Sequence, residues 1–292
     1  MIRILGTIFA ALLGLAFGSF LNVCLSRWPT DESIVSPRSH CRNCSHTLAW
    51  SENVPLLSWL ALRGRCRKCQ AWIGWRYPLV ELTVVSLWAY SAWHFLPQIL
   101  DPSASTFDSY LTLATSVGRM FFFWLLVALI VLDAENLWLP DWITLPGILI
   151  GSVLSYVLLY HNRVSGDIGM RYAYPVIYIV LSILAAAALI LLIRWLYKLI
   201  RRREGIGLGD AKLMALLAAW LGLPGALLSF GIGVVLGALV AVVLLMFPSS
   251  RPDSSAWARR RLPLGTFLCI GGIVTALWEQ PIIAAYRHWA GF

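Results

Sequence analysis

Charged side chains are scarce in this chain, and their scarcity excludes an ordinary soluble domain. Aspartate, glutamate, lysine and arginine make up 13% of the 292 residues, whereas hydrophobic residues make up 59%. Soluble domains carry roughly one-quarter charged residues, so we expect the lipid bilayer to be the main solvent of this chain. The sequence also lacks internal repeats and low-complexity segments. We therefore predict an all-α polytopic membrane protein.

A basic face of the kind that binds nucleic acid is also missing, although the formal net charge is +9. Such a face requires lysine and arginine gathered on one water-facing domain. Here they punctuate apolar runs instead. In a membrane protein this pattern reports orientation, because connections rich in lysine and arginine stay in the cytoplasm. We therefore expect no nucleic-acid partner.

Eight apolar stretches approach the roughly 20 residues that cross a bilayer as a helix. The sixth and seventh share an uncharged run of 35 residues, which as one helix would be about 52 Å long against a core of about 30 Å. We expect a turn at Leu223-Pro224-Gly225, because proline and glycine interrupt helices. The predicted spans are residues 4–25, 79–97, 111–132, 142–160, 174–197, 211–224, 226–247 and 264–285.

Basic residues gather in alternate connections, which predicts the orientation of the spans. Eight lie in the connection 26–78, and four lie in each of the connections after the fifth and seventh spans. The connection 98–110 has none, and 161–173 has Arg163 and Arg171. We therefore predict both termini outside and the three basic connections in the cytoplasm. Eight basic residues after the first span and one before it favour a retained span over a cleaved signal peptide.

Four of the six cysteines form two CxxC pairs, 21 residues apart, in the cytoplasmic connection. A reducing cytoplasm argues against disulfides, and this spacing is typical of a zinc ribbon. A catalytic zinc keeps one position open for water, and the chain contains no HExxH motif. The sequence therefore predicts a first helix (1–25), a zinc-binding loop domain (26–78) and a membrane domain of about seven helices (79–292). The predicted ligands of a structural zinc are Cys41, Cys44, Cys66 and Cys69.

Acidic residues at the edge of an apolar span are costly, so they mark candidate functional sites. Asp133 closes the third span and Asp210 opens the sixth, both at the cytoplasmic edge of the predicted topology. Two facing carboxyl groups share a proton, so one can act as a base toward water and the other as an acid toward a carbonyl. This is the arrangement of the aspartic proteases. A helix N-terminus favours the anion at Asp210, which suits the role of base.

Other roles compete with catalysis at these positions. An aspartate at a helix start is most often an N-cap, which applies to Asp210 and is the favoured interpretation of Asp141. Glu135 fits a solvated loop charge, and Lys212 fits a side chain that extends to the interface. A functional alternative is a non-proteolytic zinc-ribbon membrane transport or assembly protein in which the aspartates line an ion pathway. It predicts polar residues through the depth of several spans, whereas Arg119 is the clear intramembrane charge here.

Eight ordered motifs along most of the chain resemble the type IV prepilin peptidases, leader peptidases and N-methyltransferases of the GxGD aspartyl protease group. This sequence has Glu135 and Ala211 where members of the family often have an aspartate and an aromatic residue. The motifs are GSFLNV (18–23), RWP (27–29), PRSHCRNC (37–44), VPLLSWL (54–60), LRGRCRKC (62–69), RYPLVE (76–81), the segment 133–141 and GLGDAKL (207–213).

The resemblance implies a function for the chain. It implies that Asp133 and Asp210 cleave the leader of type IV prepilins or pseudopilins at the cytoplasmic face of the bacterial inner membrane. These substrates belong to type IV pili or type II secretion. The resemblance also implies methylation of the new N-terminus, with S-adenosylmethionine as the donor. The sequence shows no glycine-rich dinucleotide loop for this donor. Candidates for a polar pocket near the zinc loop, or else interfacial anchors, are Arg38, Arg76 and Glu81.

Overall fold

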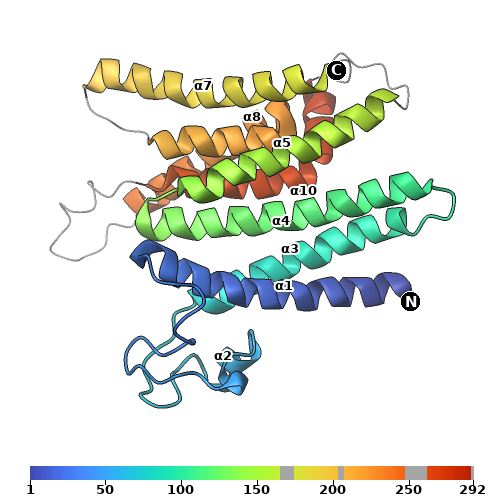
Figure 1. The fold of residues 1–292 in the computed structure, drawn as a ribbon. Coiled ribbons are helices and arrows are strands. Elements are labelled where there is room, and N and C mark those ends of the chain that lie inside the picture. Colours follow the sequence, from blue (N-terminus) through green and yellow to red (C-terminus); the bar gives the residue numbers. More distant parts are fainter. Residues whose placement is uncertain (165–173, 203–206, 247–261, 291–292) are drawn as a thin grey trace. The chain divides into compact units, whose positions relative to one another are not determined.

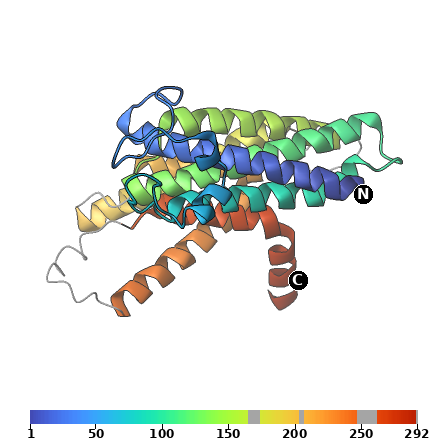
Figure 2. The same cartoon turned by 90° about the horizontal axis from the view of Figure 1, so that it is seen from below.

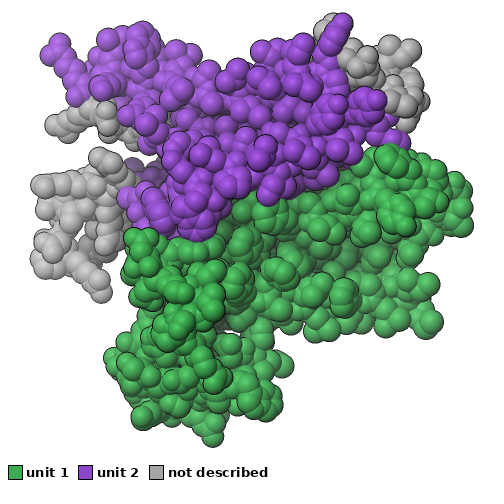
Figure 3. Space-filling view, viewed as in Figure 1, with its two compact units in different colours: residues 1–128 green, residues 129–292 purple. Residues whose placement is uncertain are grey.

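The structure, a computed structural model, describes residues 1–164, 174–202, 207–246 and 262–290. In these ranges the chain is helical, with two isolated β-bridges and no strand. It divides into two compact units, residues 1–128 (unit 1) and 129–292 (unit 2), which Figure 3 colours separately. The predicted division at residues 25 and 78 stays a prediction.

Unit 1 is built on two helices that pack closely, α1 (Ile2–Arg27) and α3 (Arg76–Ile99). They lie side by side in both views (Figures 1 and 2). A Cβ at Gly14 would lie 3.1 Å from the Val85 Cα, and one at Gly18 would lie 2.9 Å from the Glu81 Cα. Small residues of this kind let helix backbones approach in a membrane, where apolar side chains gain little by leaving lipid. The unit also contains most of α4 (Thr106–Asn136).

The chain between α1 and α3 forms a small lobe, residues 28–75, which we call the cysteine lobe (Figure 1). Its buried residues are Glu52, Gly64 and Cys66. This is too little apolar burial to form a hydrophobic core, so the lobe needs another source of stability. Its regular elements are the 3₁₀ helices η1 (Trp28–Thr30) and η2 (Trp50–Glu52) and the short helix α2 (Leu57–Ala61).

Unit 2 is arranged around α8, which packs against α5, α7 and α10. A Cβ at Gly271 on α10 would lie 2.2 Å from the Ser229 carbonyl oxygen on α8, so these backbones are in direct contact. The Ser229 hydroxyl also donates to the Thr275 hydroxyl at 3.0 Å. The helices are α5 (Asp141–Val164), α7 (Pro175–Arg201), α8 (Leu208–Met246) and α10 (Leu264–Ala290).

Six of the described helices are long and apolar enough to cross a membrane, and α10 has a shorter apolar part, Leu264–Trp278. The predicted fold class, an all-α polytopic membrane protein, is confirmed, and the chain is a multi-pass membrane protein. The sixth and seventh predicted spans both lie in α8, which accounts for part of the difference from eight. Some of the basic residues that support the predicted orientation lie outside the described residues: Arg171, Arg203, Arg251 and Arg259 to Arg261.

The break in α8 falls at Gly222, one residue before the predicted turn. Gly222 has φ 70° and ψ 176°, a conformation that is essentially restricted to glycine. A Cβ there would also lie 3.0 Å from the Tyr178 hydroxyl. Pro224 then stands in the first turn of the next helical segment, where its missing N–H has no helical partner to lose.

Candidate functional site

The two CxxC pairs form two turns with the same backbone hydrogen bonds. In each turn, the backbone N–H of the first cysteine donates to the carbonyl of the residue five positions later. The carbonyl of the same cysteine accepts the N–H of the residue four positions later. That fourth residue, Ser45 or Gln70, has a positive φ of 55° or 58°. In the first turn, the Cys41 N–H donates to the His46 carbonyl at 2.9 Å and the Ser45 N–H donates to the Cys41 carbonyl at 2.8 Å. In the second, the Cys66 N–H donates to the Ala71 carbonyl at 2.9 Å and the Gln70 N–H donates to the Cys66 carbonyl at 3.0 Å.

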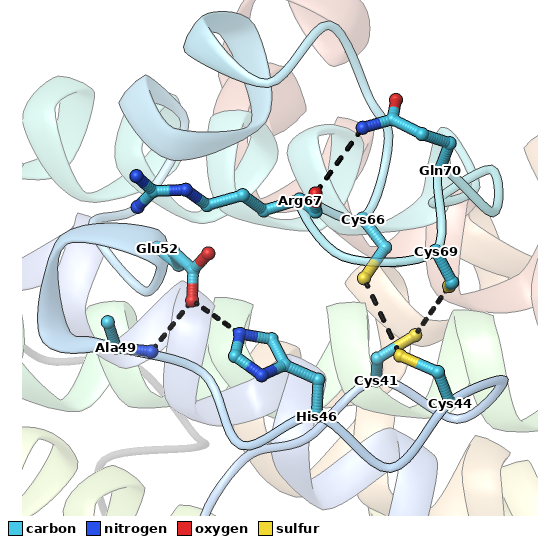
Figure 4. Close-up of polar contacts among 9 residues, drawn as sticks. All are labelled: Cys41, Cys44, His46, Ala49, Glu52, Cys66, Arg67, Cys69 and Gln70. Atoms are coloured by element: carbon cyan, nitrogen blue, oxygen red, sulfur yellow. Dashed lines mark hydrogen bonds and ion pairs between the residues drawn. The ribbon is translucent and has the colours of Figure 1, made fainter.

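The two turns bring their four thiol groups to one point (Figure 4). All four sulfur atoms lie within 4.8 Å of one another. The Sγ atoms of Cys41 and Cys69 are 3.7 Å apart, and those of Cys44 and Cys66 are 3.9 Å apart. Four sulfurs arranged tetrahedrally at about 2.3 Å from a zinc ion stand roughly 3.8 Å from one another. The donor set and its spacing therefore fit a metal ion with four thiolate ligands.

The thiol groups differ in how readily they ionise. The backbone N–H of Ala71 and the side chain of Asn43 lower the pKa of Cys69 to about 6. At Cys44 the backbone N–H of His46 lowers the pKa, but burial and the neighbouring thiols outweigh it and raise the pKa to about 11. Cys69 therefore ionises readily, whereas a further negative charge on Cys44 is disfavoured unless a cation neutralises it.

His46 contacts a carboxylate beside the cysteines (Figure 4). Its Nε2 lies 3.4 Å from Glu52 Oε2, which also accepts the Ala49 N–H at 2.8 Å. The Ala49 N–H, helped by His46 and Arg67, lowers the pKa of Glu52. His46 is half-buried and holds Glu52.

Asp133 lies in the last turn of α4 and is 5% exposed. Its Oδ2 accepts the backbone N–H of Thr266 at 2.6 Å. The Thr266 hydroxyl lies 3.1 Å from the same oxygen and 3.2 Å from the Ile130 carbonyl, and it can donate to one of them at a time. A Cβ at Gly265 would lie 2.9 Å from this Oδ2, so the first turn of α10 lies directly on the carboxylate. The sequence reasoning missed Thr266, although a Gly-Thr pair at the start of an apolar run was visible.

Asp210 lies in the first turn of α8 and is 8% exposed. It accepts the Gly207 N–H at 3.1 Å, three residues earlier, which is half of a capping box. Asp210 therefore caps the helix as predicted, but it does so from the third helical position instead of the N-cap position. Asp133 is near enough to act electrostatically on Asp210. The Leu139 side chain packs against both Gly209 and Gly265, the glycines beside the two carboxyl groups.

The remaining charges of this region lie further out. Lys212 Nζ is 2.5 Å from Asp141 Oδ1, and both side chains are substantially exposed. Asp141 was predicted to cap α5, but the cap is Pro140. The Pro140 carbonyl accepts the N–H groups of Ile143 and Thr144. Glu135 is exposed near the end of α4.

The three candidates for a cofactor pocket lie in different surroundings. Arg38 is exposed, and Arg76 is half-buried with its guanidinium 4.9 Å from the Tyr77 ring centre. Glu81 is 7% exposed and accepts the Leu56 N–H at 2.7 Å and the Asn22 amide at 3.4 Å. Of these three, Glu81 alone is a buried polar group.

Comparisons with known proteins cover both regions. The Bacterial Peptidase A24 N-terminal domain matches residues 12–95, and the Type IV leader peptidase family matches residues 120–242. A "Prepilin leader peptidase/N-methyltransferase" of Pseudomonas aeruginosa is 31% identical over 96% of this chain and 93% of its own length. Proteins of that name from Pseudomonas putida and Burkholderia pseudomallei are 33% and 34% identical, over 97% and 94% of this chain and 94% and 85% of their own lengths. No solved structure matches.

Proposed function

Because this chain belongs to the type IV leader peptidase family, we propose that it is a membrane aspartyl protease that cleaves the leader of type IV prepilins or pseudopilins. The observation that carries the proposal is the pair of buried carboxyl groups, Asp133 and Asp210, at the ends of two helices of unit 2. Such a pair hydrolyses peptides without a metal or a nucleophilic serine. The family resemblance that the motifs predicted is confirmed by the matching family models and relatives.

We propose the two roles in the order opposite to that of the sequence argument, and the hydrogen bonds support this order. Both carboxylates accept an N–H at the start of a helix, Asp133 that of Thr266 in the first turn of α10 and Asp210 that of Gly207 just before α8. The helix dipoles therefore favour both anions similarly. The hydrogen bond from the backbone N–H is shorter at Asp133, 2.6 Å against 3.1 Å at Asp210. The Thr266 hydroxyl is also within hydrogen-bond distance of Asp133. Hydrogen bonds to a charged group contribute about 1.5–3 kcal/mol each. We therefore assign Asp133 as the base and Asp210 as the acid.

Hydrolysis by this pair conserves protons. Asp133 takes a proton from a water molecule, whose oxygen forms a bond to the carbonyl carbon of the scissile peptide. Asp210 protonates the carbonyl oxygen at the same time, so no full charge develops on it. The carbon–nitrogen bond then breaks, and the nitrogen takes the proton that Asp133 accepted. Asp210 recovers its own proton as the new carboxyl group forms, which returns the pair to its starting state.

We place the protein in the bacterial inner membrane with the cysteine lobe and both aspartates on the cytoplasmic side. The eight basic residues of the connection 26–78 support this orientation. Leader cleavage at that face fits substrates of type IV pili or type II secretion systems.

We propose that the metal of the cysteine lobe is zinc and that its role is structural. Cys41, Cys44, Cys66 and Cys69 would complete a tetrahedral shell, which leaves no position for a water nucleophile. The lobe has little buried apolar surface, so binding of the ion would supply the free energy that holds its two turns together.

We also propose that the chain methylates the new N-terminus, with S-adenosylmethionine as donor. The names of the relatives support this second activity. The amine lone pair forms a bond to the methyl carbon, and the carbon–sulfur bond breaks with its electron pair on sulfur. The amine then gives up one proton, to a carboxylate or to water.

The test of the protease is leader cleavage of a model prepilin by the full-length protein in detergent, read from the mass of the product. We expect Asp133→Asn and Asp210→Asn each to reduce cleavage by about 10³-fold or more, because each removes one of the groups that move protons. Glu135→Gln, an exposed carboxylate on the same helix as Asp133, is the control and should cleave normally. Normal cleavage by either aspartate variant would instead favour the transport or assembly alternative.

A further inference from the structure

The second half of the cysteine lobe exposes large apolar side chains. Leu57 and Leu60 of α2 are 66% and 63% exposed and lie three residues apart, on one face of that short helix. Trp75, the residue before α3, is 60% exposed, and Trp72 is exposed as well. We call these four residues the apolar cluster. Single exposed apolar residues are common, but a group of them indicates a surface that contacts another molecule or a membrane.

The tryptophans of the apolar cluster are held in place by their neighbours. The Trp59 ring lies against both Trp72 and Trp75, with 5.9 and 4.6 Å between ring centres. Trp59 itself donates its indole N–H to the Ile73 carbonyl at 3.1 Å. Gly64 leaves room for these rings, since a Cβ there would lie 2.7 Å from the Trp72 ring. Because the rings are already ordered, little conformational entropy is lost when their exposed surface is covered.

The apolar cluster is continuous with the exposed side of a membrane helix. Trp75, Leu79 and Leu82 follow one another at intervals of four and three residues, so they lie on one face of α3, and each is more than half exposed. The helix α3 is long and apolar enough to cross a membrane. Figure 1 shows α2 alongside the C-terminal half of α1, not beyond its end. The cluster therefore lies at the depth where spans enter the bilayer, and tryptophan is enriched at that depth.

The same part of the chain is basic. Residues 53–78 contain five basic residues and no aspartate or glutamate. Three of the five, Arg63, Arg65 and Lys68, are exposed, and their side chains make no hydrogen bond or ion pair within the described part of the chain. A surface of this kind attracts an anionic partner and repels a cationic peptide. Exposed aromatic and aliphatic side chains next to unpaired bases are typical of segments that lie on an anionic membrane surface.

We propose that the apolar cluster, together with Arg63, Arg65 and Lys68, docks the cysteine lobe on an anionic phospholipid surface. Leu57, Leu60 and the tryptophan rings enter the headgroup region, and the three basic side chains bind lipid phosphates. In the orientation proposed above, this surface is the cytoplasmic leaflet, which carries anionic lipids. The lobe is then held by the bilayer as well as by its metal. Neither leader cleavage nor methyl transfer, as proposed above, gives these residues a role.

Hydrogen–deuterium exchange of the full-length, zinc-loaded protein in lipid nanodiscs tests the docking. One set of discs contains phosphatidylcholine alone, and the other contains phosphatidylcholine mixed with phosphatidylglycerol. Both faces of a disc carry the same lipids, so the test does not depend on the orientation of the protein. We expect the backbone N–H groups of α2 to exchange about tenfold more slowly in the anionic discs, because each base near an anionic surface strengthens binding about fivefold. Added salt should reduce this difference, because it screens exposed charges.

Substitutions separate the role of the charge from that of the fold. The combined variant Arg63→Gln, Arg65→Gln and Lys68→Gln removes three positive charges and should lose the difference between the two sets of discs. The matched control, Arg63→Lys with Arg65→Lys, keeps the charges and should keep the difference. Zinc content, measured on every variant, reports whether the lobe is folded, and the comparison of wild-type protein in the two sets of discs requires no substitution.

A phosphatidylglycerol analogue with a photoactivatable headgroup locates the contact directly in the wild-type protein. We expect label in peptides that contain Leu60 or Trp75. Equal exchange of α2 in the two sets of discs, or label confined to other helices, would overturn the proposal. Protection of α2 that requires an added prepilin, and not anionic lipid, would assign the surface to a protein partner. A glutamine variant that keeps the exchange difference but loses zinc would show that these bases serve the thiolates instead, and this outcome also contradicts the proposal.

Discussion

The cysteine lobe and the aspartate region are held in place by different means. The lobe, residues 28–75, buries three residues and is organised by short turns around four thiols that are close in sequence. Asp210 lies on α8, which packs backbone against backbone with α10, and Asp133 accepts the N–H of Thr266, which is distant in sequence. The lobe therefore depends on what it binds, whereas the aspartate region depends on how its helices pack. This difference predicts that the two regions fail under different perturbations.

Removal of the metal should produce the largest effect and should act on the lobe. Zinc bound by small domains contributes about 10–16 kcal/mol to folding, far more than the three buried residues of the lobe can replace. We expect chelation, or Cys66→Ser, to unfold the lobe, because its two turns meet at the four thiols and little else in it is buried. Leader cleavage should fall much less, since Asp133 and Asp210 have all their described partners in unit 2.

Parallel assays of zinc content, protease resistance of the lobe and leader cleavage on one chelated sample check this prediction. Cys24→Ser is the control, because Cys24 is a buried cysteine of α1 outside the cluster. Equal loss of the lobe's protease resistance and of leader cleavage on chelation would show that the two regions do not fail separately.

Gly271→Ala should disrupt the packing on which the aspartate region depends. The new Cβ would meet the Ser229 carbonyl at 2.2 Å, and a backbone atom cannot move aside as a side chain can. Forced overpacking costs about 1–3 kcal/mol or more, against a gain of up to about 1 kcal/mol from replacing a helical glycine by alanine. We expect a lower melting temperature and reduced cleavage, with zinc content unchanged.

Gly231→Ala is the matched control for this substitution. A Cβ at Gly231 of α8 meets no atom within 4 Å, so the gain in helix propensity should remain and the protein should be as stable as wild type or slightly more so. If both alanine variants were equally stable, the close approach of α8 and α10 would not matter for stability.

Thr266→Val should have a smaller effect, confined to cleavage. The substitution keeps the backbone N–H that donates to Asp133 and removes the hydroxyl that lies 3.1 Å from the same oxygen. Loss of one hydrogen bond near a charged group corresponds to about 1.5–3 kcal/mol, so cleavage should fall roughly tenfold or more. Thr266→Ser restores the hydroxyl and should restore most of the rate, which a purely steric role of Thr266 would not predict. A valine variant that cleaves at the wild-type rate would remove Thr266 from the positioning of Asp133.

The same contrast explains how much the sequence could reveal. The four cysteines were predicted to come together, and the structure brings them within 4.8 Å, because two CxxC turns are local and their spacing is visible along the chain. The roles of Asp133 and Asp210 stay predictions. Their depth could be inferred from the ends of apolar runs, but the partner of Asp133 could not, because Thr266 lies 133 residues away and has no local signal of pairing.

The break in α8 shows the same limit on a smaller scale. Leu223-Pro224-Gly225 predicted an interruption from composition alone, and the interruption exists. Its location at Gly222 depends on a positive φ and on the Tyr178 hydroxyl of α7, 3.0 Å from where a Cβ would stand. Composition indicates that a helix breaks, whereas tertiary contacts choose the residue.

Lys212→Met should have the smallest effect, although Lys212 stands two residues from Asp210. Its ammonium pairs with Asp141 at 2.5 Å, but the side chains are 37% and 58% exposed, and exposed ion pairs contribute about 0–1 kcal/mol. We expect thermal stability within a few degrees of wild type and cleavage within a few-fold. A loss of cleavage comparable to that of Asp210→Asn, at unchanged stability, would show that Lys212 acts on the carboxyl pair. The boundary of the catalytic machinery would then include the ion pair that joins the starts of α5 and α8, and the aspartate region would depend on charge as well as on packing.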